Sequence, residues 1–106
     1  MAYLVSCGWT IEAHRFRVAR RELDVVARKD GMVAIVEVKT RASHNCGEPA
    51  ESVRWRKQRT LAQVAEVWRE RHGRVGDAFR FDVIEVRLEG GGCRVEHLED
   101  AWRIER

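Results

Sequence analysis

Cysteine, proline and long apolar stretches are all scarce in this sequence of 106 residues. The three cysteines, Cys7, Cys46 and Cys93, lie far apart and show no Cys-x-x-Cys spacing, which argues against a disulfide framework or a tetrahedral zinc site. The longest apolar stretch, residues 32–36, is too short to span a membrane. No secretory signal pattern opens the chain, so we expect a cytoplasmic protein without a membrane partner.

Neither sign of charge dominates the composition. Lys and Arg total 20 against 17 Asp and Glu, a net charge of +3, which is unlike a polybasic disordered arm. With 44% apolar residues the chain can fill one modest core, so we expect a single domain over residues 1–106. Only three basic residues are lysines, Lys29, Lys39 and Lys57, a weak indication that a compact ammonium group is favoured there.

Hydrophobic periodicity predicts strands in the first half of the chain. Apolar and polar residues alternate over 9–17 and 22–29. Asp30-Gly31 is a strong hairpin-turn signal. Residues 32–36 are apolar on both faces, which is typical of a central strand covered on both sides, and this strand ends in Glu37-Val38-Lys39. A polar loop is expected over residues 40–49.

The second half predicts a helix and two further strands. Apolar residues at 61, 64, 65 and 68 indicate one face of a helix that begins near residue 50 or 53 and ends at Arg71. Strands are expected over 78–88 and 93–98. A helix between strands predicts a crossover connection, so we expect an α/β fold with a mixed central β-sheet and a flanking helix.

Charged residues occupy the ends of the most buried strands. If Asp30 and Gly31 form the turn, paired positions place Asp24 opposite Glu37 on the same face of the sheet. Two carboxylates that close repel each other, and a divalent cation removes that cost by taking both as ligands. Lys39 projects from the same face, where an ammonium group can orient water or stabilise charge on a phosphate. The competing interpretation is a cross-strand ion pair of Lys39 with Asp24 or Glu37.

Basic residues gather in two segments that we expect to face phosphate groups. Such residues neutralise a nucleic-acid backbone without recognising its sequence. The alternative is a charged helix face that only contacts solvent, and the charge distribution by itself favours this alternative. The candidate nucleic-acid contacts are Arg15, Arg17, Arg20, Arg54, Arg56 and Lys57.

An Asp followed by Glu-x-Lys on adjacent strands is the signature of the PD-(D/E)xK nuclease superfamily, here Asp24 and Glu37-Val38-Lys39. The segments 21–31 and 36–41, followed by Lys57-Gln58 and residues 80–83, further resemble the YraN-type family of endonuclease-like proteins. This resemblance implies a restriction-endonuclease-like core, related to that of Holliday-junction resolvases. It also implies an N-terminal helix, largely missing here, whose acidic residue has no counterpart in this sequence.

The resemblance also implies roles for individual residues. Asp24, Glu37 and the Val38 carbonyl would hold Mg²⁺ or Mn²⁺, Lys39 would be the catalytic lysine, and Gln58 would support the site from the helix. Glu22 shares a face with Asp24 and is a further acidic candidate. Ordinary roles compete for two of them: Gln58 as a solvated helix residue and Glu22 as a strand-edge residue that favours solubility.

The leading functional hypothesis is a metal-dependent endonuclease that hydrolyses phosphodiester bonds of DNA, with branched or structured DNA as a substrate class. The alternative is a non-catalytic nucleic-acid-binding or scaffold protein that keeps the nuclease fold. A small protein–protein adaptor is a third hypothesis. The sequence leaves the oligomeric state open, and a homodimer is one candidate state because resolvase-like folds often dimerise.

Overall fold

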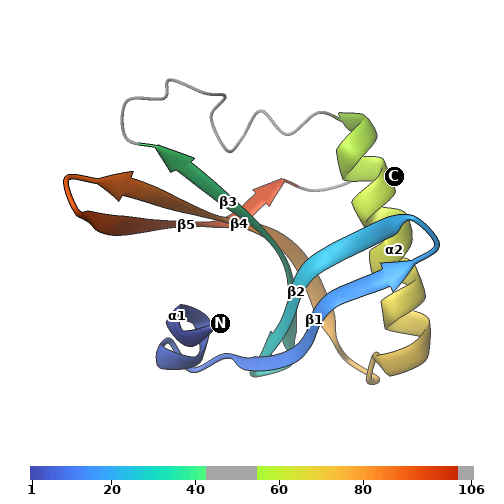
Figure 1. Cartoon of the computed structure of the whole chain (residues 1–106). Helices are drawn as coiled ribbons and strands as arrows, with labels where there is room; N and C mark the ends of the chain where they lie inside the picture. The colour runs from blue at the N-terminus through green and yellow to red at the C-terminus, as the bar shows by residue number, and fades with distance from the viewer. Residues whose placement is uncertain (43–54, 103–106) are drawn as a thin grey trace.

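A computed structural model describes residues 1–42 and 55–102. These residues form one five-stranded sheet, in the order β1-β2-β3-β4-β5, and two helices (Figure 1). Strands β3 and β4 run parallel, whereas the other neighbouring pairs run antiparallel. The predicted α/β fold with a mixed sheet and a flanking helix is confirmed. The elements are α1 (Ala2–Ser6), β1 (Thr10–Val18), β2 (Arg21–Lys29), β3 (Met32–Ala42), α2 (Trp55–His72), β4 (Ala78–Glu89) and β5 (Gly92–Trp102).

A two-residue turn sets the register of β2 and β3. Asp30 and Gly31 have φ values of 50° and 78°, and positive φ at both central residues is what a type I′ hairpin turn requires. Lys29 pairs with Met32, and the pairing continues to Val25 with Val36. The register predicted from the Asp-Gly signal is therefore confirmed as far as this last pair.

Strand β3 is apolar on both faces because both faces are covered. Val33 and Ile35 pack in a buried cluster with Trp68 of α2. Ala34 and Val36 pack on the opposite face in a cluster that includes Leu4 of α1. The continuous apolar stretch in the sequence follows directly from this position between the two helices.

Helix α2 covers only part of its face of the sheet. It packs on β2 and, to a lesser extent, on β1, while the β4–β5 hairpin extends away from it (Figure 1). Gly73 follows the helix, as predicted, and its N–H donates to the Arg69 carbonyl at 2.8 Å. Neither helix in the described part of the chain is long and apolar enough to cross a membrane.

Two strands are longer than the sequence predicted. Strand β3 continues to Ala42, where a loop was expected, because Thr40 and Arg41 pair with Val86 and Arg87 of β4. Strand β5 continues to Trp102 through an irregularity in its pairing with β4, near Asp100, which has a φ of 51°. The rest of the expected loop and the predicted helix start near residue 50 or 53 lie outside the described residues.

Candidate active site

A cavity of about 230 Å³ lies between the first turns of α2 and the middle of β3, residues 35–39, and residues 22–24 of β2 also line it. Its apolar lining includes Leu61, Phe81 and Trp102. The structure thus brings the predicted Asp24, Glu37 and Lys39 to one cavity. Its charged lining consists of four acidic residues, Glu22, Asp24, Glu37 and Asp82, and two lysines, Lys39 and Lys57.

Glu37 differs from the other buried carboxylate of this cavity, Asp82, because one of its oxygens has no partner among the described residues, although only 8% of its surface is exposed. One of its oxygens, Oε1, forms an ion pair with Lys57 of α2. The other, Oε2, is buried without a hydrogen-bond partner among the described residues. A buried carboxylate oxygen without a partner is costly, so this site favours a bound cation.

Asp24 is held against β3 by a main-chain contact. The Val38 N–H donates to Asp24 Oδ2 at 2.9 Å, just beyond the last described pair of the β2–β3 ladder. This bond fixes the carboxyl group at the cavity and leaves Oδ1 without a hydrogen bond from the described part of the chain. Oδ1 of Asp24 is therefore available to bind a cation.

Lys39 lies two residues after Glu37 on the same strand and also lines the cavity. Its side chain is half-buried, yet it forms no hydrogen bond or ion pair with any described residue. The competing ion pair of Lys39 with Asp24 or Glu37 is therefore not formed, since Glu37 pairs with Lys57 instead. Lys39 leaves a positive charge free to face a bound anion.

The donor set of the cavity fits a hard divalent cation, which prefers carboxylate and carbonyl oxygens. The orphaned Glu37 Oε2 and the second oxygen of Asp24 supply such donors. Across residues 1–42 and 55–102, no group of three His, Cys, Asp or Glu side chains is placed to hold a metal. A third protein ligand would therefore be a main-chain oxygen, and the Val38 carbonyl stays the predicted one.

Glu22 lines the cavity but is occupied by two arginines. Arg17 Nε and Arg15 Nε donate to its two oxygens at 2.7 and 3.2 Å. These hydrogen bonds, first that from Arg17, lower the pKa of Glu22 below its ordinary value. Glu22 is thus an anchor for the two arginines, and the phosphate contacts predicted for Arg15 and Arg17 would have to compete with it.

The other predicted nucleic-acid contacts have mixed outcomes. Lys57 points to Glu37, and Arg20 is exposed in the β1–β2 turn. Arg54 lies outside the described residues, as does the side chain of Arg56. Gln58 follows Lys57 on α2 and is half-buried, but it is not among the described residues that line the cavity.

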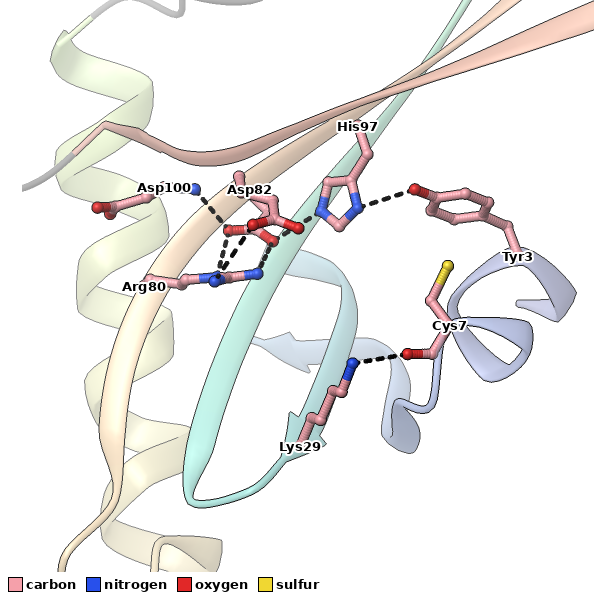
Figure 2. Close-up of polar contacts among 8 residues, drawn as sticks. Tyr3, Cys7, Lys29, Arg80, Asp82, His97 and Asp100 are labelled. Atoms are coloured by element: carbon pink, nitrogen blue, oxygen red, sulfur yellow. Dashed lines mark hydrogen bonds and ion pairs between the residues drawn. The ribbon is translucent and has the colours of Figure 1, made fainter.

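Asp82 is a buried residue of the cavity lining, and Figure 2 shows it at the centre of a polar network. Arg80 contacts both of its oxygens at 3.0 Å, and the Asp100 N–H donates to Oδ1 at 2.9 Å. His97 Nε2 lies 2.7 Å from Oδ2, and its Nδ1 lies 3.2 Å from the Tyr3 hydroxyl. Burial, as the main cause, raises the pKa of Tyr3, which keeps its hydroxyl protonated. The network ties α1, β4 and β5 together.

Asp77, near the start of β4, is a second carboxylate whose pKa is lowered by its partners. Arg28 donates to it, and so does the Arg74 N–H at 2.7 Å; the contact with Arg28 is the larger cause. The folded protein therefore binds fewer protons at Glu22 and Asp77 than the unfolded chain does.

We expect Glu22 and Asp77 to contribute fully to the free energy of unfolding above their ordinary pKa values of 4.5 and 3.8. This contribution should be lost as pH falls through their lower pKa values in the folded protein. Urea unfolding at a series of pH values from neutral to acidic measures this loss. Asp77→Asn should show a shallower loss of stability in this range. If Asp77→Asn lost stability with falling pH as steeply as wild type does, the lowered pKa of Asp77 would be contradicted.

Lys57 and Trp102 are the residues of this cavity whose roles were missed by sequence reasoning. The sequence predicts Lys57 to contact phosphate groups. The scarcity of lysine among the basic residues was a weak signal that Lys57 has a special role. Trp102 lies beyond the predicted end of β5, yet its ring stacks on Phe81 with centroids 4.0 Å apart. Its position depends on the irregular pairing of β4 and β5, for which the sequence carries no clear signal.

Comparison with known proteins gives one consistent result. Residues 1–86 match the family described as Uncharacterised protein family UPF0102. The chain belongs to the UPF0102 family. This confirms the resemblance to YraN-type proteins that residues 21–31 and 36–41 indicated.

Relatives within the UPF0102 family cover most of the chain. A UPF0102 protein of Chloroherpeton thalassium is 39% identical over 98% of this chain and 82% of its own length. A UPF0102 protein of Alkaliphilus metalliredigens is 37% identical over 94% of this chain and 87% of its own. A third, from Myxococcus xanthus, is 36% identical over 94% of this chain and 79% of its own.

Proposed function

We propose that this protein is a metal-dependent endonuclease that hydrolyses phosphodiester bonds of DNA, with branched or structured DNA as its substrate class. The observation that carries the proposal is the cavity that gathers Asp24, Glu37 and Lys39, in which Glu37 Oε2 is buried without a described partner. The order Asp, then Glu-x-Lys, on adjacent strands of a mixed sheet supports the same conclusion.

Each residue would have a distinct task. Asp24 and Glu37 would hold Mg²⁺ or Mn²⁺, which acts as a Lewis acid on the phosphate and lowers the pKa of a bound water molecule. Lys39 would donate hydrogen bonds to phosphate oxygens as negative charge builds on them. Leu61 and Phe81 form an apolar wall that limits water at the reacting group.

The test of this proposal is calorimetric titration of Mn²⁺ into wild type and Glu37→Gln, with cleavage of branched DNA measured in parallel. Glu37→Gln keeps the shape of the side chain but removes a charged ligand, so we expect metal affinity to fall about tenfold or more and cleavage to be lost. Lys57→Ala is the matched variant, because it frees Glu37 Oε1 from its ion pair. It should bind Mn²⁺ more tightly than wild type. Equal, negligible heats in all three proteins would reject the metal site.

The second candidate is a nucleic-acid-binding protein without hydrolytic activity. It is favoured by the Lys57 ammonium, which already neutralises part of the Glu37 charge, and by the lack of a third acidic ligand among the described residues. In this case DNA would bind with strong salt dependence. Salt-dependent binding without Mn²⁺ uptake or cleavage would select this candidate over the enzyme.

A further inference from the structure

A groove of about 610 Å³ runs between α2 and β4, next to the candidate active site. We call it the α2–β4 groove. Two small residues of α2, Ala62 and Ala65, form one wall, and Phe79 and Phe81 of β4 line the other. Phe81 also lines the candidate active site. The two hollows therefore adjoin at this one aromatic ring.

The aromatic wall of the α2–β4 groove is held in place by packing. Phe81 stacks on Trp102, with ring centroids 4.0 Å apart and an angle of 17° between the planes. Phe79 packs edge-on against Trp68, with ring centroids 6.2 Å apart. Both phenylalanines are only half-buried, so part of each ring faces solvent. The groove thus offers a preformed aromatic surface whose side chains are already ordered.

The rim of the groove is polar and carries both signs of charge. Glu66 and Arg69 of α2 form an ion pair there, and Asp100 of β5 adds a further acidic group. Arg80 also lines the groove, but its guanidinium is paired with the buried Asp82. Such a rim does not attract a phosphate, which would favour uncompensated positive charge. It suits an uncharged planar group with hydrogen-bonding edges, which describes a nucleobase.

We propose that the α2–β4 groove binds an unpaired nucleobase adjacent to the phosphodiester in the candidate active site. This inference rests on the proposed function and narrows its substrate to DNA with an unstacked nucleotide beside the scissile bond. The base contacts the exposed parts of the Phe79 and Phe81 rings, while Ala62 and Ala65 leave the space that it fills. A base inside a blunt duplex cannot reach the groove, because it stays stacked.

The test compares three DNA duplexes by fluorescence anisotropy in EDTA, so that neither metal binding nor hydrolysis contributes. One duplex is blunt, one has a short single-stranded extension, and one has the same extension made of abasic nucleotides. The abasic extension adds equal phosphate charge without bases. We expect wild type to bind the base-containing extension about tenfold more tightly than either of the others.

A variant that fills the groove should remove this preference. Ala62→Phe places a ring in the groove, whereas Glu70→Phe adds the same ring at an exposed position of α2 outside it. We expect Ala62→Phe to bind the base-containing and abasic extensions equally and Glu70→Phe to behave as wild type. Should Ala62→Phe fail to fold, 2-aminopurine in the extension gives a second readout with wild type, since stacking on an aromatic ring quenches its fluorescence.

The outcomes separate this inference from the proposed function. A base preference that Ala62→Phe abolishes supports the groove even if no cleavage is found. Equal binding of the base-containing and abasic extensions by wild type, or a preference that persists in Ala62→Phe, would overturn the inference even if the protein cleaves DNA. An unquenched 2-aminopurine would overturn it as well.

Discussion

Lys39→Ala is expected to slow DNA cleavage by about 10²–10⁴-fold, the range that a well-placed catalytic group commonly contributes. The reason is that Lys39 lines the cavity and pairs with no described residue, so its charge is available to the reacting phosphate. For the same reason the free energy of unfolding should hardly change. Single-turnover cleavage of a labelled branched DNA measures the rate, and urea unfolding measures the stability.

The chain offers a matched control for this variant. Lys29 is exposed and donates to the Cys7 carbonyl at 2.8 Å (Figure 2), and it is not among the described residues that line the cavity. Lys29→Ala removes the same charge and should leave cleavage within about twofold of wild type, an order-of-magnitude expectation for a distant surface site. Cleavage that survives in Lys39→Ala would indicate a different active site or a contaminating nuclease.

Asp82→Ala is expected to lower the free energy of unfolding by about 3–5 kcal/mol, because removing one partner leaves buried charged and polar groups uncompensated. Asp82 is 1% exposed and accepts contacts from Arg80, His97 and the Asp100 N–H. Asp82→Asn keeps the shape but not the charge and should cost less. Urea unfolding of both variants at neutral pH gives the comparison.

Glu99→Ala provides the control for Asp82, because Glu99 also contacts Arg80, at 3.8 Å, but its side chain is 63% exposed. An exposed ion pair contributes only about 0–1 kcal/mol, so this variant should be nearly neutral. If Asp82→Ala lost no more stability than Glu99→Ala, the buried network would not be what ties α1 to the sheet.

Much of the fold was predictable, because the decisive signals are local. The Asp30-Gly31 turn fixed the β2–β3 register, and the two-sided apolar stretch of residues 32–36 marked the central strand. The predicted C-terminal ends of β3 and β5 were wrong, because both strands continue further than expected. Polar residues such as Thr40 gave no local sign of pairing with β4, and the extension of β5 depends on a register shift near Asp100.

The candidate site was predictable only in part. Asp24, Glu37 and Lys39 share a cavity because strand register and alternation place them there. The ion pair of Glu37 with Lys57 could not be predicted, because Lys57 lies on a helix distant in sequence. The contacts of Glu22 with Arg15 and Arg17 could not be predicted either, because they depend on the local course of β1 and β2. Contacts between elements distant in sequence carry no periodic signal.

The tight turn between β2 and β3 has a kinetic consequence. A two-residue connection closes with little loss of chain entropy, so this hairpin should assemble early, whereas the parallel pairing of β3 with β4 must wait for α2. We therefore expect Asp24 and Glu37 to approach each other in the hairpin before Lys57 of α2 has docked. Added salt, by screening this transient repulsion, should speed the first step of refolding more than it changes the final stability.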